Sequence, residues 1–587
     1  MLKTLQAAKS PGQATLAITN GRVVNVCTGE IYEGGVACHG EKIIAQGDVG
    51  YAIGPDTKVI DAGGRPIVPG FLEGHIHPES ANLSPGRFAE VVLAHGTTST
   101  FSDFHEIAIV RGIDGVNAAL DEVAATPLNF FWIVPSHVPF SGEFETSGGY
   151  FNSDIVGAAM ERPEAWGLSE VVSKFVLDEN PDLLRSIGHN NRWRKAQVGH
   201  GPATYGKDWN AFVSVGIAND HEAVNEEDVL IRARNGVYTH LRHSLICPTL
   251  PALLGVVRKY NLDTKLFSLV TDDTNAIVLH EDGHIDMLAR IAMGEGIDFV
   301  TAMQMVTFNT AVSYHAERIV GSLSPGRLAD ILILSDDSPE FKVDLTVAKG
   351  EVVAENGKCL KDYGGIEHDP IMFGTFNVGP AKSVEDLVIA APEGANSAEV
   401  HVMKMLPETP YVTTGMETRL AVRDGYLQAD PEQDIFHMAV VERHQATGNV
   451  GKAFVAGFGM KSGALACSMA HDNHNIVVAG ANPEDMLRAV NRVIEMDGGV
   501  CLADGGEEVL SVPTPLFGLL SDEPAAVFAE KKKALLAACK ERGCGVSDPH
   551  LFLAFLTLVP IPAFKLTDKG YVDSIAWEFK EPVLRWN

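Results

Sequence analysis

His75 and His77 follow the apolar stretch 66–72, which is typical of a buried strand. Alternate side chains of a strand point to the same side, so both imidazoles would face the same way. Two neutral imidazoles provide half of a divalent transition-metal site. The same pair also occurs as a surface or core feature, so it indicates a metal site only if further ligands accompany it.

Four further candidate ligands stand at the ends of other strand-like stretches; they are Glu170, His200, His221 and Asp272. In a (β/α)₈ barrel, the residues at the carboxyl ends of the strands form the catalytic face. One or two of these side chains could instead be hydrogen-bonded core groups, but that alternative does not explain why the whole set falls at strand ends. The spacing therefore predicts a metal centre at the mouth of a barrel.

The chemistry of this set is that of metal-assisted hydrolysis. Histidines would hold two divalent ions, and a carboxylate between them can bridge the ions. Divalent ions lower the pKa of a shared water towards about 7, which gives hydroxide at neutral pH. Asp272 could bind a metal and also carry a proton from that water to the leaving group. A nitrogen and oxygen donor set suits Zn, Mn, Fe or Co.

Two other polar clusters could contribute to a site. Asp103, His105 and Glu106 come directly after a strand-like stretch, and they either contact a polar substrate or solvate and cap a loop. His471 and His474 could form an accessory metal or pocket element. They could equally belong to a turn rich in Asx hydrogen bonds, which is the interpretation we favour.

The order of the expected elements divides the chain of 587 residues into three units of an α/β protein. Strand-like stretches with Asn-Gly and Gly turns flank a long middle part, and we expect residues 1–68 and 324–364 to form one small composite β-sandwich domain. Residues 69–323 alternate strands with helices, which predicts a TIM-like (β/α)₈ barrel of a metal-dependent hydrolase. Residues 365–587 would form an additional C-terminal α+β domain.

The charge and cysteine content exclude several classes of protein. The formal net charge of −30 argues against a nucleic-acid partner and an anionic membrane, and the basic run 531–533 is interpreted as a solvated helix face. No apolar run is long enough to span a membrane, and the first residues lack an apolar core of signal-peptide length, so we expect neither a membrane span nor a signal peptide. The eight cysteines are scattered without a CxxC pair, as in a protein with reduced thiols. We therefore expect a cytoplasmic protein.

Short motifs along nearly the whole chain match one known family. They include Gly74-His-Ile-His-Pro78 within 69–80 and Ala470-His-Asp-Asn-His-Asn475, and the others lie at 103–107, 167–170, 199–202, 220–222, 271–273, 283–286, 515–522 and 565–568. With these motifs the chain resembles the bacterial adenine deaminases of the amidohydrolase superfamily. The C-terminal motifs are the more specific ones, because the wider superfamily shares the barrel histidines.

The resemblance implies a binuclear metal centre with two divalent ions, Mn, Fe or Zn. One ion would be bound by His75, His77 and Asp272. The other would be bound by His200 and His221, and Glu170 would bridge the two ions.

The resemblance also implies a reaction, the hydrolysis of adenine to hypoxanthine and ammonia. In such enzymes the acids that match Asp103 and Glu106 lie in the active site and take part in substrate binding or proton transfer, and Asp272 is the third catalytic carboxylate. The implied partner is a small purine-like substrate, and a homo-oligomer is the default expectation.

Some segments differ from the family pattern. Pro78–Ala81 replaces Ile-Glu-Ser-Ser, Phe104 replaces a proline, and Leu241–Ser244 replaces an Arg-Glu-Gly-Ser segment that lies near the substrate. The last difference motivates a second hypothesis, an amidohydrolase of another substrate class such as a cyclic amide or an N-acyl compound. A metal-binding protein without catalysis is a third hypothesis.

Overall fold

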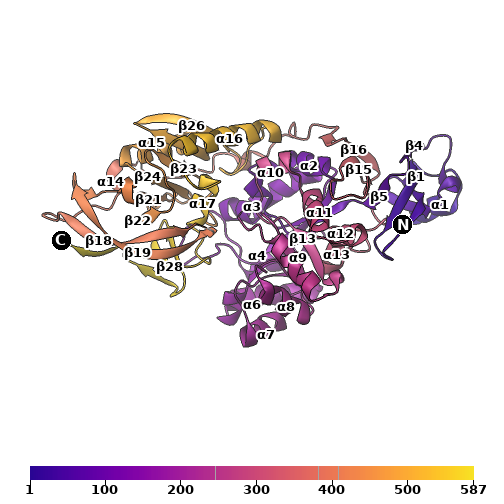
Figure 1. Cartoon of the computed structure of the whole chain (residues 1–587), viewed down its shortest axis with the longest axis horizontal. Coiled ribbons are helices and arrows are strands. Elements are labelled where there is room, and N and C mark those ends of the chain that lie inside the picture. Colours follow the sequence, from indigo (N-terminus) through magenta and orange to yellow (C-terminus); the bar gives the residue numbers. More distant parts are fainter. Residues whose placement is uncertain (245, 381, 408) are drawn as a thin grey trace.

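The computed structural model describes residues 1–587 apart from residues 245, 381 and 408. Among the described residues, the strands form three large sheets and one small sheet. The barrel lies in the middle of the molecule, with the N-terminal strands at one end and the C-terminal unit at the other (Figure 1). Across those same described residues, no helix is both long and apolar enough to cross a membrane.

The middle of the chain forms an eight-stranded parallel sheet whose described strands follow one another in chain order. A parallel bridge between Ile76 and Asp272 joins its two edges, and Asp272 N donates to His75 O at 2.9 Å. This nearly closed sheet is the predicted (β/α)₈ barrel. Its strands are β6 (Phe71–Glu73), β7 (Thr97–Ser102), β8 (Asn129–Pro135), β9 (Ala165–Val172), β10 (Ala196–His200), β11 (Asn219–Asp220), β12 (Tyr238–Arg242) and β13 (Phe267–Val270).

Helices connect the barrel strands, and several begin at a side chain that caps the first turn. The Asn180 side chain, for example, accepts from the amides of Asp182 and Leu183, with Pro181 at the first helical position. The helices of this part are α2 (Pro85–Ala94), α3 (His105–Ala124), α4 (Ser153–Met160), α5 (Ser173–Leu177), α6 (Pro181–Trp193), α7 (Gly206–Ser214), α8 (Glu226–Arg234), α9 (Leu250–Lys259), α10 (Ala276–Glu281), α11 (Ile285–Gly294), α12 (Phe299–Met305) and α13 (Phe308–Ser313).

Strands from both sides of the barrel segment share one nine-stranded sheet, preceded by α1 (Leu2–Lys9). The two flanks join where β14 pairs antiparallel with β5. The N-terminal strands are β1 (Leu16–Asn25), β2 (Glu30–His39), β3 (Lys42–Gly47), β4 (Lys58–Asp61) and β5 (Pro66–Pro69). The others are β14 (Ile331–Leu334), β15 (Val343–Ala348), β16 (Glu351–Glu355) and β17 (Lys358–Cys359).

The C-terminal unit contains a ten-stranded sheet, a three-stranded sheet and four α-helices in its described residues. The large sheet consists of β18 (Ser397–Leu406), β19 (Thr409–Arg423), β20 (Tyr426–Leu427), β21 (Ile435–Val441), β22 (Val450–Ala456), β23 (Ala464–Cys467), β24 (Ile476–Gly480), β25 (Gly499–Asp504), β26 (Glu507–Pro513) and β30 (Val583–Trp586). The small sheet consists of β27 (Phe564–Thr567), β28 (Gly570–Asp573) and β29 (Glu578–Lys580). The helices are α14 (Val384–Leu387), α15 (Pro483–Glu495), α16 (Ala525–Glu541) and α17 (Pro549–Phe555).

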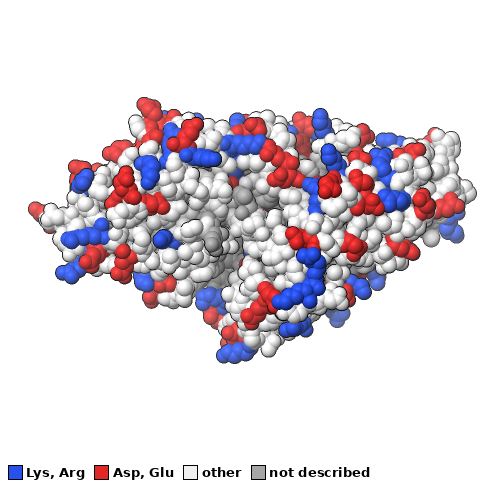
Figure 2. All heavy atoms as spheres, in the orientation of Figure 1, with Lys and Arg blue, Asp and Glu red and all other residues white. Residues whose placement is uncertain are grey.

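The C-terminal unit packs against the catalytic end of the barrel. Leu83, just after the first barrel strand, bridges to Ser521, and the backbones around them exchange hydrogen bonds of 2.8 and 2.9 Å. Further along the contact, Thr146 donates to both oxygens of Asp568. One continuous hydrophobic cluster contains residues of both units, among them Phe104 and Phe555. The unit is therefore held by packing and by backbone pairing. On the face seen in Figure 2, acidic and basic side chains intermingle over both units.

The basic run 531–533 is not a uniformly solvated face, so that interpretation is wrong for Lys532. Lys532 is 3% exposed, and its Nζ lies 3.2 Å from Asp548 Oδ2. Burial opposes the charge of Asp548, but Lys532 and His550 outweigh it and hold the pKa of Asp548 well below its usual range. Only its neighbours, Lys531 and Lys533, form partly exposed ion pairs.

We predict that Lys532→Met lowers the free energy of unfolding by about 3–5 kcal/mol, because it leaves a buried carboxylate without its cation. Urea unfolding measures this difference. Lys540→Met, on the exposed side of the same helix, should change the free energy by less than about 0.5 kcal/mol. Equal effects of the two substitutions would contradict the importance of the buried pair.

The buried Asp286 gives a pH dependence whose sign is fixed by its partners. Burial raises its pKa, but His95 and Arg290 outweigh burial and lower it from 3.8 to about 2. A carboxyl with a depressed pKa in the folded state stabilises the fold above its unfolded pKa, and this contribution is lost as the pH falls. The shift corresponds to about 2 kcal/mol.

We therefore predict that Asp286→Asn lowers the free energy of unfolding by about 2 kcal/mol near pH 6. The difference in this free energy between the variant and the wild type should narrow as the pH falls from about 4 towards 2. Urea unfolding at a series of pH values measures the gap. Asp282→Asn, at an exposed carboxylate close by, serves as the control. A gap that is independent of pH would show that the charge of Asp286 is not responsible.

Candidate active site

The six predicted metal ligands meet at the carboxyl ends of the barrel strands. Overlapping groups of them have ligand atoms within 4.8 Å of one another. They lie on or directly after five different strands: His75 and His77 after β6, Glu170 in β9, His200 at the end of β10, His221 after β11 and Asp272 after β13. The structure thus brings together every side chain that the sequence singled out as a ligand.

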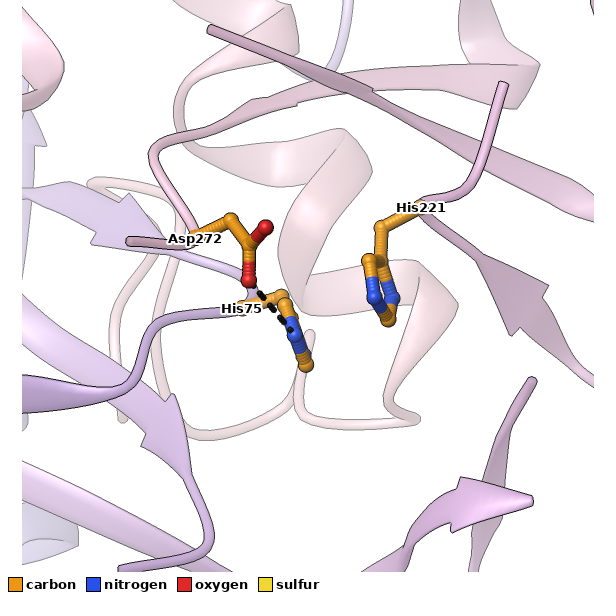
Figure 3. Close-up of side chains that lie close together, drawn as sticks. All are labelled: His75, His221 and Asp272. Atoms are coloured by element: carbon orange, nitrogen blue, oxygen red, sulfur yellow. Dashed lines mark ion pairs between the residues drawn. The ribbon is translucent and has the colours of Figure 1, made fainter. Parts of the chain in front are cut away.

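Glu170 lies at the centre of this cluster. Its Oε1 is 3.3 Å from His75 Nε2 and 3.6 Å from His221 Nε2, and its Oε2 is 2.6 Å from His200 Nδ1. Asp272 Oδ1 is 3.3 Å from His75 Nε2, and the rings of His75 and His221 stack with centroids 3.7 Å apart (Figure 3). A carboxylate within reach of imidazoles from three strands is placed to bridge two ions.

The backbone at Glu170 and Asp272 departs from regular strand geometry. The register between β9 and β10 shifts between Gln197 and Gly199, so β9 carries one extra residue there. Glu170 has φ 51° and Asp272 has φ 59°, which is the left-handed region. Non-glycine residues occupy this region rarely, and bulges of this kind re-aim side chains next to active sites. The bulge explains how Glu170 reaches the histidines from the middle of a strand.

The donor set fits a divalent transition metal. His75 Nε2 and Glu170 Oε1 are buried and have no hydrogen-bond partner among the described residues. Buried polar atoms are normally paired, so unpaired atoms that converge on one point indicate a missing partner. Imidazole nitrogen together with carboxylate oxygen suits Zn, Mn or Fe. The residues present therefore support a divalent metal at this place.

The electrostatics of the cluster favour ionised carboxylates. Burial alone lowers the pKa of His75, but Asp272 and Glu170 outweigh burial and raise it to about 10. Burial likewise opposes the charge of Glu170, yet His200, His75 and His221 hold its pKa well below the usual range. Carboxylates bind metal ions in this ionised form, whereas His75 must lose its proton to bind one, so metal binding here would release a proton.

Two residues of the site were missed by the sequence analysis. Arg242, at the end of β12, donates to Glu222 Oε1 at 2.8 Å and to Asp272 Oδ2 at 2.6 Å. All three side chains are buried. Burial raises the pKa of Glu222 and of Asp272, but the nearby guanidinium of Arg242 outweighs burial and holds both pKa values below their usual ranges. The available signals were the position of Glu222 next to His221 and that of Arg242 at a strand end.

The two predicted acids of the stretch after β7 have different surroundings. Asp103 Oδ1 lies 3.4 Å from His77 Nδ1 and also accepts from the amide of His105, while its Oδ2 accepts from the Ser169 hydroxyl at 2.7 Å. Asp103 therefore borders the ligand cluster and also accepts from the first amide of α3, as expected for a residue that caps a helix. Glu106 instead turns towards the C-terminal unit.

Glu106 contacts His471 and His474, whose roles the sequence left open. His471 Nδ1 lies 3.3 Å from Glu106 Oε1, and His474 Nε2 contacts Glu106 Oε2. The expected Asx hydrogen bonds are present as well, since the amide of Asn475 donates to Asn473 Oδ1. The turn interpretation is correct but incomplete, because the same turn brings two histidines to the barrel.

A cavity of about 400 Å³ lies over the ligand cluster. The barrel contributes five of the six predicted ligands together with Arg242 and Phe140, and the C-terminal unit contributes Tyr411, His471, Phe555 and Pro562. The aromatic rings come from both units, so the C-terminal unit forms one wall of the cavity. Its size and its mixture of apolar walls with a few polar groups are those of a small-molecule site.

Comparison with known proteins agrees with this geometry. Residues 410–577 match the model of the adenine deaminase C-terminal domain, and residues 219–353 match that of the amidohydrolase family. The chain is 37% identical to the adenine deaminase of Ruegeria pomeroyi over 98% of this chain and 96% of that protein. It is 38% identical to the adenine deaminase of Mesorhizobium japonicum, covering 95% and 93%, and 35% identical to that of Moorella thermoacetica, covering 96% and 95%. The chain belongs to the adenine deaminase family.

Solved structures resemble the chain more remotely. Phenylurea hydrolase B is 16% identical with a TM-score of 0.45, and the similarity covers 58% of this chain and 96% of that one. Dihydropyrimidinase from Brevibacillus agri is 13% identical with a TM-score of 0.44, covering 59% and 96%. The residues that match the adenine deaminase C-terminal domain include His471 and His474, and those that match the amidohydrolase family include His221 and Asp272.

We predict that Glu170→Gln lowers the divalent metal bound per chain, because the substitution removes the central charged ligand. Losing one ligand or its support typically costs 10- to 100-fold in metal affinity. Elemental analysis after loading with Mn²⁺ and gel filtration measures the loss. Glu145→Gln is the matched control, because burial raises the pKa of Glu145 to about 8 and this carboxyl is already neutral. Unchanged metal content in Glu170→Gln would contradict the assignment.

Proposed function

We propose that the protein is a metal-dependent deaminase that hydrolyses adenine to hypoxanthine and ammonia. The observation that carries the proposal is a complete ligand cluster under a cavity whose far wall belongs to the adenine deaminase C-terminal domain. Similarity over almost the whole length to proteins named adenine deaminase supports the substrate. The flat aromatic rings of Phe140 and Phe555 along the cavity suit a planar heterocycle.

The metal centre that we propose holds two divalent ions, Mn, Fe or Zn. His75, His77 and Asp272 would hold one ion and His200 and His221 the other, with Glu170 between them. The distances around Glu170 and the unpaired atoms of the cluster support this division. When bound, such ions lower the pKa of water towards about 7 and so supply a nucleophile at neutral pH.

Asp272 is the residue placed to move protons. Its Oδ2 is occupied by Arg242, which fixes the orientation of the carboxylate and leaves Oδ1 directed at the ligand cluster. Oδ1 would take one proton of the water that adds to C6 of adenine and pass it to ring N1, which gives a tetrahedral C6 with a hydroxyl group. It would then take the proton of this hydroxyl and deliver it to the amino nitrogen, so that the C–N bond breaks, ammonia leaves and the C6 carbonyl of hypoxanthine forms.

Asp103 and Glu106 complete the set of proposed active-site acids. Asp103 lies beside His77 and would accept a hydrogen bond from a ring N–H of the purine. Both oxygens of Glu106 are already in contact with His471 and His474. We therefore assign Glu106 a positioning role, in which it fixes His471 in the wall of the cavity.

The remaining expectations are proposals of the same kind. The division at residues 68/69, 323/324 and 364/365 is supported by the three large sheets, because apart from Pro69 of β5 no described strand crosses one of these limits. All eight cysteines are unpaired, which supports a reducing compartment such as the cytoplasm. A homo-oligomer stays the default expectation.

A second candidate function is hydrolysis of another substrate class, a cyclic amide or an N-acyl compound. The replaced segment Leu241–Ser244 favours it, because Arg242 of this segment contacts Asp272 and lines the cavity. A screen of cyclic amides and N-acyl compounds would separate the two functions, since cleavage of those substrates need not release ammonia.

We predict that Mn²⁺-loaded protein releases ammonia from adenine, and that Asp272→Asn lowers kcat at least about 100-fold, because the amide cannot carry the proton. A coupled ammonia assay together with metal analysis measures both properties. Asp282→Asn, at an exposed position, should keep the wild-type kcat. Adenine that remains unchanged by the metal-loaded wild type would overturn the proposed substrate, and a fully active Asp272→Asn would overturn the proton role.

A further inference from the structure

The contact between the barrel and the C-terminal unit contains a second group of metal-type ligands. Glu106 lies in the first turn of α3, and His471 and His474 lie between β23 and β24. Glu106 and His474 are 368 positions apart in the chain. One ligand atom from each of the three side chains lies within 4.8 Å of the others. None of the three belongs to the six ligands of the barrel centre.

These three side chains are withdrawn from solvent. Glu106 is 2% exposed, His471 5% and His474 1%. A buried carboxylate is costly unless a cation or several hydrogen bonds compensate its charge. In the described part of the chain, the ion-pair partners of Glu106 are histidines alone, without lysine or arginine.

A second carboxylate, that of Glu79, lines the same small cavity as these three side chains. Glu79 is 3% exposed, and its Oε2 has no hydrogen-bond partner among the described residues. Glu79 thus adds a second acidic group where no strong base is paired with the first one.

A small cavity lies between these groups. Its volume is about 20 Å³, and Glu79, Glu106, His471 and His474 are among its lining residues. This is the space for one water molecule or one ion. The cavity, the unpaired oxygen and the three clustered ligands are independent observations that indicate the same place.

We infer that Glu106, His471, His474 and Glu79 form a third metal site, which takes one divalent transition-metal ion. Two imidazoles and two carboxylates are a donor set for Zn²⁺, Mn²⁺ or Fe²⁺. The three clustered side chains together with Glu79 would supply four protein ligands, the number typical of a structural site. The two carboxylates would also balance the two positive charges of the ion, so the ion would be the cationic partner of Glu106 and Glu79.

The ion would join the two units at the edge of the substrate cavity. Its ligands come from the barrel on one side and from the C-terminal sheet on the other. Glu106 and His471 also line the cavity of about 400 Å³. The third ion would therefore fix the wall that the C-terminal unit contributes, without sharing a ligand with the barrel centre.

The test uses the full-length protein loaded with Mn²⁺ and freed of excess ion by gel filtration. Elemental analysis should give one Mn²⁺ per chain more in the wild type than in His474→Gln. Electron paramagnetic resonance should show the signal of an isolated Mn²⁺ in the wild type, and His474→Gln should lose it. A magnetically coupled pair in the barrel gives a different signal, so the two sites are distinguished even if the proposed deaminase activity is absent.

The matched control is His437→Gln. His437 is 2% exposed in β21 and accepts a hydrogen bond from the amide of Ala429, away from these carboxylates. It should keep the wild-type metal content and signal. Glu79→Gln is the second test variant and should weaken binding of the isolated ion at least about tenfold. If His474→Gln does not fold, Glu79→Gln tests the inference in its place.

The inference fails if the wild type lacks the isolated signal. It also fails if His474→Gln and Glu79→Gln keep the wild-type signal and metal content. Either result would mean that Glu106, His471 and His474 form only a buried ion-pair cluster, with water in the small cavity.

Discussion

The site depends on keeping a buried, ionised Glu170 within reach of imidazoles from three strands. A charge removed from water is unfavourable unless oppositely charged or donating groups surround it. His75, His200 and His221 supply that surrounding, and they can do so because parallel strands end at one face of the barrel. The β-bulge and the left-handed backbone at Glu170 are the local cost of this arrangement.

The second carboxylate, Asp272, depends on a different group. Its contact with Arg242 fixes one oxygen, so the other is directed at His75. The backbone amide of Asp272, which follows β13, also closes the barrel, because it donates a hydrogen bond to His75 O. The residue that is placed to carry a proton is therefore also the residue that joins the first and last strands, which ties the geometry of the site to barrel closure.

The C-terminal unit is part of the site rather than an appendage. It shares one hydrophobic cluster with the barrel, and it provides Tyr411, His471 and Phe555 to the cavity. A barrel alone would leave the ligand cluster open to water on that side. Covering it lowers the local dielectric constant and strengthens every charge interaction within the cavity.

The sequence by itself determined the fold class and the six clustered ligands. Strand ends can be recognised from apolar runs, and parallel topology then brings residues such as His75 and Asp272 to one face wherever they stand in the chain. Only the tertiary structure decided the contacts of Arg242, the burial of Lys532 and the meeting of Glu106 with His474. The first two join different elements within one unit, and the third depends on how the barrel and the C-terminal unit pack. Local periodicity carries no information about such partners.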